Sequence, residues 1–295
     1  MANSFVLAQN YLGILDEIYK QGAKSTALDA TNVEFVNADT IKYYKMTVDG
    51  LADYDRNNGF VAGSTTGTWE THQLKIDRAV ELGVDRMDNE ETRDLAFGKL
   101  LGEFGRTQMN PEIDAYRFAK LAGTANILKA SADIVRGTTD VAALIDEAEE
   151  AMNEKEVPQE GRLLYVSETA YGALRAKIVR EIRNGEGNLN NNVEVYNEMQ
   201  IIRVPQNRFL SAITLNDGSS AFGYSKATGA KKINFMIVHP SAVLACKKLA
   251  VAKVFSPEEN QKKDGWLFQT RLYHDIFVRE NKLDGVYAHI GVTNA

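Results

Sequence analysis

The chain has 295 residues, of which 44% are hydrophobic and 25% charged, an ordinary composition for a globular protein with room for two domains. Its formal net charge of −6 argues against a dedicated nucleic-acid-binding protein, which normally carries a strong basic excess. No stretch approaches the ~20 uninterrupted apolar residues of a membrane span. The N-terminus also lacks the basic start and long apolar stretch of a signal peptide. The single cysteine, Cys246, excludes an intramolecular disulfide and is interpreted as a small buried hydrophobe.

The N-terminal part predicts a short amphipathic helix over residues 7–20, followed by a polar, turn-prone tether over residues 21–32. The apolar residues with helical spacing are Leu7, Tyr11, Ile14, Leu15 and Ile18. Such a helix either docks as an arm on another subunit or packs on its own domain. The pattern favours neither.

Residues 72–87 alternate apolar and polar side chains for longer than an ordinary strand of about 3–10 residues. One face carries Leu74, Ile76, Val80, Leu82 and Val84, broken only by Arg78, and the other carries Gln73, Lys75, Asp77, Glu81 and Asp85. Residues 40–46 are predicted as the opposing strand and the glycine-rich residues 59–68 as the tip. A two-stranded ribbon is marginal alone, so its apolar face needs cover, most economically from a neighbouring copy. This segment therefore predicts an assembly protein.

A long helical pattern follows the ribbon, from residue 89 to about residue 122. Asp88 is predicted as its N-cap, with Glu91 at the third helical position. Pro111 either kinks this helix or starts a second one capped by Asn110. The expected core positions are Leu95, Leu101, Phe104, Ile113 and Tyr116. We interpret the segment as a spine helix beneath a sheet.

The remaining sequence predicts a mixed α/β domain followed by further strands. A helix is expected over residues 141–153, capped by Thr139 or Asp140, with Leu144, Ile145, Ala148 and Met152 facing inward. Further expected elements are a strand over 163–166, a helix capped by Ser167 and ending at Gly185, a loop over 184–192, strands over 194–204 and 233–238, and a helix over 240–249. The final strands are predicted over 251–255, 265–278 and 285–292.

No common enzyme motif occurs in the sequence. Glycine-rich phosphate loops and Gly-x-Ser-x-Gly are absent, and none of the four histidines has another at i+3 or i+4. His239, at a predicted strand-to-helix junction, is interpreted as structural rather than catalytic. The acid-rich residues 85–91 are explained by helix capping rather than by a cation. We therefore predict no catalytic residue, no metal ligand and no cofactor.

Four segments in order resemble one family. They are VDGLADYDRNNG at 48–59, LKIDRAVELGVDRMDNEET at 74–92, PEIDAYRFAK at 111–120, and RLYHDIFV at 271–278 with KLDGVYAH at 282–289. Over nearly the whole chain they resemble the major capsid proteins of tailed double-stranded-DNA bacteriophages, whose fold is shared with encapsulins. The resemblance implies an α+β fold with an N-terminal arm over 1–36 and an extended β-hairpin loop over 37–87. It also implies a peripheral domain with the spine helix and a long sheet over 88–136 and 250–284, and an axial domain over 137–249 and 285–295.

The resemblance further implies a structural, non-enzymatic protein of the virion. Family members assemble into pentamers and hexamers that close an icosahedral head around double-stranded DNA, with a portal, in the host bacterial cytoplasm. Because the chain starts almost at the arm, we expect a separate scaffolding protein or an already matured sequence. The acidic charge fits weak, non-specific contact with packaged DNA, and no membrane partner is expected. The alternatives are an encapsulin-type compartment shell or, less favoured, a cytosolic α/β enzyme.

Overall fold

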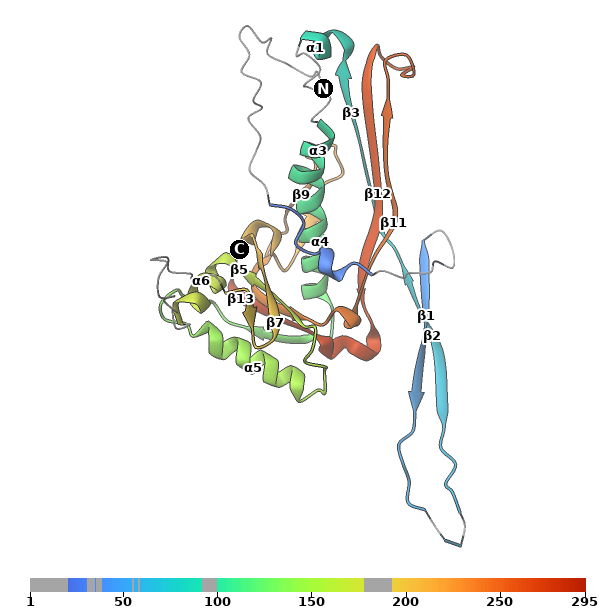
Figure 1. Cartoon of the computed structure of the whole chain (residues 1–295), viewed down its shortest axis with the longest axis vertical. Coiled ribbons are helices and arrows are strands. Elements are labelled where there is room, and N and C mark those ends of the chain that lie inside the picture. Colours follow the sequence, from blue (N-terminus) through green and yellow to red (C-terminus); the bar gives the residue numbers. More distant parts are fainter. Residues whose placement is uncertain are drawn as a thin grey trace, which may run out of the picture.

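A mixed α/β unit, a tall three-stranded sheet beside a long helix, and a projecting two-stranded hairpin make up the computed structural model (Figure 1). The structure describes residues 21–30, 35, 39–54, 56–57, 59–91, 100–177 and 193–295. The predicted helix over 7–20, the predicted loop over 184–192 and the predicted core residue Leu95 lie outside the described residues.

The projecting hairpin consists of β1 (Thr40–Val48) and β2 (Thr65–Gln73), which pair antiparallel with Tyr44 opposite Trp69. The predicted strand over 40–46 is confirmed. Its predicted partner is wrong, because the strand pairs with residues that were placed partly in the tip rather than with residues 74–87.

The long alternating segment is two strands, not one. The first, β2, ends at Gln73, and the second, β3 (Ile76–Asp85), pairs with a different sheet. At the break, Leu74 N–H donates to Asp39 O at 2.8 Å, and Lys75 N–H donates to the Asp275 carboxylate at 3.1 Å. The alternation of apolar and polar side chains continues through the break because each strand turns one face inward. The two strands do so in different sheets.

The three-stranded sheet has the antiparallel order β11-β12-β3, with β11 at Val243–Phe255 and β12 at Gly265–Val278. The predicted helix over 240–249 is wrong: a 3-10 turn at Pro240–Ala242 leads directly into β11. Residues 243–246 are all buried, and such a short apolar run does not distinguish strand from helix. This strand also crosses residue 249, where the axial domain was predicted to end; the division into four regions stays a prediction.

Within the predicted spine-helix segment, the described elements are α1 (Arg86–Glu91), α3 (Leu100–Phe104), a π-helical turn at Gly105–Met109, and α4 (Asn110–Gly123), the last three following one another without a break. The predicted N-cap is wrong: Asp88 lies inside α1, and the Asp85 carboxylate accepts from Met87 N–H instead. Asn110 is helical, with φ −62° and ψ −45°, so it is not a cap either. Its N–H bonds to Gly105 O, five residues back, and this wider turn carries the chain into Pro111, which has no N–H to donate.

The mixed unit contains a six-stranded sheet in the order β4-β13-β10-β5-β7-β6. Its strands are β4 (Leu128–Ser131), β5 (Leu163–Ser167), β6 (Val195–Tyr196), β7 (Met199–Val204), β10 (Lys231–Val238) and β13 (Val286–Asn294). The other elements are the helices α5 (Val141–Asn153) and α6 (Glu168–Lys177), a small hairpin of β8 (Ile213–Leu215) and β9 (Tyr224–Lys226), and the 3-10 turns η1 (Thr26–Leu28), η3 (Gln206–Arg208) and η5 (Glu280–Gly285).

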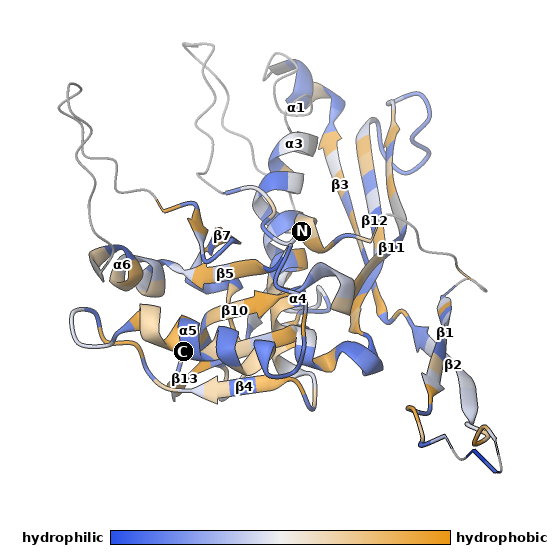
Figure 2. Cartoon of the chain, turned by 60° about the horizontal axis from the view of Figure 1, so that its bottom comes forward, coloured by the Kyte–Doolittle hydropathy of each residue, from blue (hydrophilic) through white to orange (hydrophobic). Residues whose placement is uncertain are grey.

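The two faces of this sheet are covered by different helices. On one face, Ile145 and Met152 of α5 pack with Leu164 of β5, and on the other, Phe118 and Leu121 of α4 form a second cluster. Apolar residues are concentrated on β5 and β10 (Figure 2). The predicted helix over 141–153 is confirmed, with Asp140 as its cap, and Ser167 accepts a hydrogen bond from Ala170 N–H at the start of α6.

Candidate functional site

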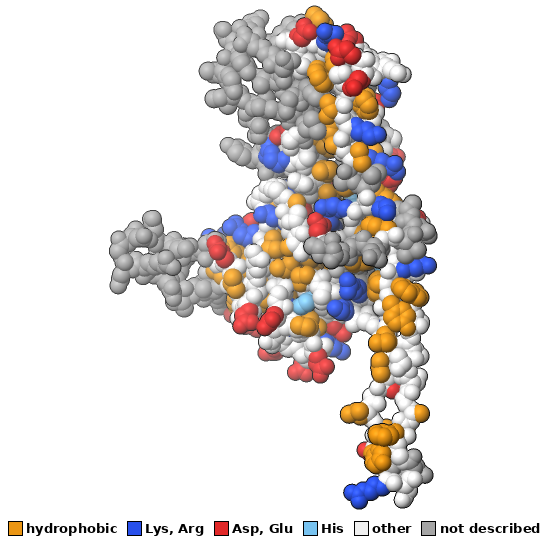
Figure 3. All heavy atoms as spheres, turned by 45° about the vertical axis from the view of Figure 1, so that its right-hand side comes forward, with side chains coloured by type: hydrophobic (Ala, Val, Ile, Leu, Met, Phe, Trp, Pro, Cys, Tyr) orange, Lys and Arg blue, Asp and Glu red, His pale blue; other side chains and the backbone are white. Residues whose placement is uncertain are grey.

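One face of the hairpin carries an exposed apolar stripe. Tyr44, Met46, Val48 and Trp69 share this face, and between 55% and 65% of each residue is exposed. The Tyr44 and Trp69 rings meet edge to face, with centroids 5.3 Å apart. The connection between the strands adds Leu51, Tyr54, Phe60 and Val61, also exposed. Figure 3 shows hydrophobic side chains along the hairpin toward its tip. Contiguous apolar surface of this kind marks a site of association.

The stripe depends on Gly67, which lies opposite Met46. The Tyr44 ring crosses over this glycine, where a Cβ atom would lie 1.6 Å from the Tyr44 hydroxyl oxygen. An aromatic ring that covers a glycine in a neighbouring strand is a known way to stabilise sheet pairing. Here the contact with Gly67 also holds the Tyr44 ring flat against the hairpin, on the same face as Trp69.

The opposite face anchors the hairpin root to the body. Lys45 Nζ pairs with the Glu280 carboxylate of η5 at 2.7 Å. The His72 ring stacks on Phe277 of β12 at 4.5 Å between centroids, and its Nε2 lies 2.7 Å from the Glu70 carboxylate. Ile41 and Leu74 are buried in a cluster that includes Leu244 and Cys246. The hairpin is therefore fixed at its root.

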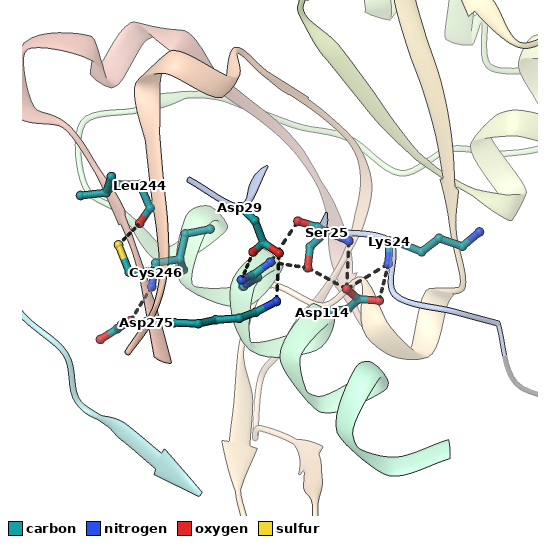
Figure 4. A network of polar contacts seen from close by, with 10 residues as sticks. Lys24, Ser25, Asp29, Asp114, Leu244, Cys246 and Asp275 are labelled. Carbon is teal, nitrogen blue, oxygen red and sulfur yellow. Dashed lines mark hydrogen bonds and ion pairs between the residues drawn. The ribbon is translucent and has the colours of Figure 1, made fainter. Parts of the chain in front are cut away.

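A second site is the buried polar network that holds residues 21–30 against the body (Figure 4). The Asp114 carboxylate of α4 is fully buried. It accepts hydrogen bonds from Lys24 N–H, from Ser25 N–H at 3.0 Å and from the Ser25 hydroxyl at 2.7 Å. Arg208 of η3 pairs with the same carboxylate at 3.1 Å. A buried carboxylate is tolerated only when it is paired in this way.

Arg117 and Lys247 continue the network. The Arg117 guanidinium, fully buried on α4, donates to the carbonyl and hydroxyl oxygens of Ser25 and to the Asp29 carboxylate. Lys247 Nζ of β11 donates to the other Asp29 oxygen at 2.9 Å. Burial alone would raise the pKa of Asp29, but its contacts with Lys247 and Arg117 outweigh burial and lower it. Ala30 N–H then bonds to Ala245 O at 3.0 Å.

A third polar centre is Asp275 of β12, which is also fully buried. Its carboxylate accepts from the Tyr116 hydroxyl at 2.7 Å, from Lys120 Nζ, and from Lys75 N–H at the hairpin root. Burial and the charge of Asp275 raise the pKa of Tyr116. The neighbouring His274 has its pKa lowered to about 4, chiefly by burial and also by the charge of Arg117.

Arg78 interrupts the apolar face of β3 because it joins three elements. Its guanidinium pairs with Glu112 of α4 at 2.7 Å and donates to the carbonyl oxygens of Asn216 and Gly223, the two ends of the connection between β8 and β9. The lone cation in an apolar stripe was a visible signal in the sequence. Its partners could not be predicted from the sequence, because they lie 34 to 145 residues away.

The apolar face of β3 turns toward the spine helix and is only partly covered within the described chain: Val84 is buried, whereas Val80 and Leu82 are half-buried. That this face covers a neighbour stays a prediction. Val80 and Leu82 face the spine helix and line, with Phe104, Met109 and Ile113, a cavity of about 590 Å³ between the sheet and the helix. The stripe on the hairpin is the more exposed of the two apolar surfaces.

Sequence comparisons find no matching protein-family model and no matching curated protein. Solved structures do match. The mature capsid of bacteriophage PhiM1 has a TM-score of 0.68 at 12% identity, covering 98% of this chain and 93% of that chain. The capsid of cyanophage P-SCSP1u has a TM-score of 0.66 at 13% identity, with the same coverage. A structure from Microbacterium phage Oxtober96 has a TM-score of 0.63 at 14% identity, covering 97% and 96%. The chain has the fold of a phage capsid protein.

The capsid fold confirms the predicted α+β class and the resemblance to tailed-phage major capsid proteins. Within this fold, Cys246 is buried in β11, and burial raises the pKa of its thiol to about 12, which leaves it a poor nucleophile. His239 accepts a hydrogen bond from Ser241 N–H and caps the turn before β11. In the described part of the chain, no three His, Cys, Asp or Glu side chains gather as a metal site. None of the described helices combines the length and apolarity needed to cross a membrane.

Proposed function

We propose that this chain is the major capsid protein of a tailed bacteriophage, assembling into the pentamers and hexamers of an icosahedral head that encloses double-stranded DNA. The observation that carries the proposal is the exposed aromatic stripe of Tyr44 and Trp69 on a hairpin that projects from a capsid fold. Closed symmetry multiplies modest contacts, because each subunit binds several neighbours at once. The subunit therefore functions through its surfaces, and we propose no enzymatic activity.

The proposed location and partners of the protein follow from its proposed role in an icosahedral head. The protein is a virion component assembled in the cytoplasm of the host bacterium, with a portal at one vertex. A separate scaffolding protein is proposed to guide assembly.

Contact with the packaged DNA is proposed to be weak and independent of sequence. The formal net charge of −6 limits the number of phosphates that the subunit neutralises, and that number sets both affinity and salt dependence. Filter binding of the purified chain to duplex DNA at moderate salt is expected to show little retention. Tight, sequence-independent retention would contradict this part of the proposal.

Electron microscopy of the purified full-length protein, alone and with the products of neighbouring genes, tests the proposal. Closed particles of uniform size built from pentamers and hexamers, and able to take up DNA with a terminase and portal, are expected. Closed particles that instead purify with a protein cargo would support an encapsulin-type compartment. Discrete small oligomers with a turnover activity would overturn the shell assignment and favour an enzyme.

A further inference from the structure

Helix α4 anchors two segments that lie far apart in the sequence. On one side, Asp114 and Arg117 hold residues 24–29 of the N-terminal segment. On the other, Tyr116 and Lys120 hold Asp275, which in turn accepts from Lys75 N–H at the root of the hairpin. Two turns of one helix therefore support both the N-terminal segment and the hairpin.

The two anchors are also joined away from the helix. Asp29 of the N-terminal segment accepts from Lys247 of β11, and the next residue, Ala30, bonds to Ala245 of the same strand. In the pairing of β11 with β12, Cys246 stands opposite Asp275. The contacts thus form a closed circuit that runs from α4 through the N-terminal segment, β11 and β12 back to α4. Figure 4 shows the centre of this circuit.

The centre of the circuit has no access to water, whereas the side chains of Asp29, Lys120 and Lys247 are about one-third exposed. Asp114, Arg117 and Asp275 are each fully buried. A contact broken in such a place leaves a buried charge or donor unpaired, which is much more costly than at a surface. The neighbouring contacts must then move to satisfy that group, so the loss of one anchor is transmitted to the next.

We infer that the docking of residues 21–30 and the seating of the hairpin root are coupled through α4. Asp114 and Tyr116 are two residues apart on the helix and do not face each other, so the coupling does not come from direct contact. It is a property of the single chain and does not depend on the proposed assembly. Because a coupling free energy between two sites is reciprocal, a disturbance at either anchor must affect the other.

Hydrogen exchange of the purified full-length chain tests the inference, with Asp114→Asn as the first variant. This change keeps the shape of the side chain and removes its charge. Exchange at Lys24 and Ser25 is expected to quicken because their acceptor is weakened. The decisive readout is Lys75, which does not touch Asp114: its amide should exchange about tenfold faster or more, as for a lost bond to a charged group.

The reciprocal variant is Tyr116→Phe, which removes one hydroxyl from Asp275. Faster exchange is expected at Lys75 and also at Ala30 in the N-terminal segment. If Asp114→Asn accelerates exchange throughout the chain, the variant is globally destabilised. Ser25→Ala then replaces it, since this change removes the hydroxyl bonds to Asp114 and Arg117 from the other side.

A matched control is Arg203→Gln, which breaks an exposed ion pair with Glu168 in the mixed unit. It should change exchange at neither Lys75 nor Ala30. The inference is overturned if each anchor variant accelerates exchange only in its own segment.

Discussion

Three arginines, Arg117, Arg162 and Arg208, are almost completely buried, and each donates to main-chain carbonyl oxygens. Arg117 contacts the carbonyl of Ser25, and Arg208 contacts those of Gln21 and Gly22. Arg162 contacts the carbonyls of Val157 and Pro158 beyond the end of α5. A guanidinium presents five donors in a fixed plane, which suits irregular segments whose carbonyls have no partner in a helix or sheet.

His274 should make the stability of the fold depend on pH. Its pKa in the folded chain is about 4 because of burial, against about 6.5 in an unfolded chain. The unfolded state therefore binds a proton first, and stability falls as the pH drops from about 6.5 to about 4, by up to about 3 kcal/mol. Urea denaturation at pH 7 and pH 4.5 should show a smaller loss for His274→Gln than for the wild type. Equal losses would show that another group causes the dependence.

At the level of elements, the sequence predicted the helix whose periodic face and cap agree, misplaced the cap at Asp88, and failed where an apolar run fits both a strand and a helix. The helix over 141–153 has both a periodic face and the cap Asp140, and it was predicted within its observed bounds. Residues 243–246 are buried on both sides, so they carry no period, and β11 was mistaken for a helix. The break at Leu74 left the alternation intact, so the last two residues of β2 were predicted as one strand with β3.

Less of the candidate site than of the fold could be predicted from the sequence. The polar networks join Asp114 to Ser25, 89 residues earlier, and Asp275 to Tyr116, 159 residues earlier. Such pairs have no local signature, because only the tertiary fold brings them together. The aromatic stripe was missed for another reason. Tyr43 and Tyr44 are adjacent, so the strand carries an aromatic residue on each face and the sequence alone does not show which face stays exposed.

Arg78 offers a test at the scale of elements, since it fastens the β8–β9 hairpin to β3 and α4. Arg78→Met should cost about 2 kcal/mol of stability, because Glu112 loses its partner in a partly buried place. Limited proteolysis should then cut residues 213–226 sooner. Arg271→Met on the opposite, exposed face of the same sheet is the control and should have little effect. Equal stability and equal proteolysis rates of the two variants would show that Arg78 does not hold the β8–β9 hairpin in place.

Leu82 tests which side of β3 is internal. The side chain faces the spine helix, so Leu82→Asp should introduce an unpaired charge there and destabilise the subunit itself. Thermal unfolding of the unassembled chain should show a lower midpoint. A variant with an unchanged midpoint but lost assembly would instead support the prediction that this face covers a neighbour.

At the scale of the whole molecule, the body and the projecting hairpin differ in where their apolar side chains lie. The body buries its apolar residues in two clusters around the six-stranded sheet and in a third at the hairpin root. The hairpin beyond its root keeps large apolar side chains in solvent, among them Met46 and Trp69. We therefore propose that stability and association are encoded in different parts of the chain.

Trp69→Asp is expected to leave the folding of the subunit unchanged and to reduce assembly strongly. The residue is 65% exposed, so its loss removes little from the folded subunit, whereas large aromatic residues often dominate an interface. Particle yield by gradient sedimentation and the thermal midpoint of the unassembled chain are the two measurements. Thr66→Asp, on the opposite face of the same strand, should assemble more fully. The stripe would lose its proposed role if both variants assembled alike.

The way in which residues 21–25 are held has a consequence for how freely this stretch can vary. Arg208 contacts the carbonyls of Gln21 and Gly22, and Asp114 contacts the amide of Lys24, so the side chains of Gln21 and Lys24 make none of these bonds. Substitutions at these two positions should accumulate with little penalty. Proline is the exception at Lys24, because it would remove an amide N–H that donates to Asp114. The same holds for proline at the next residue, Ser25. Random mutagenesis should therefore recover many residues at Lys24, but not proline.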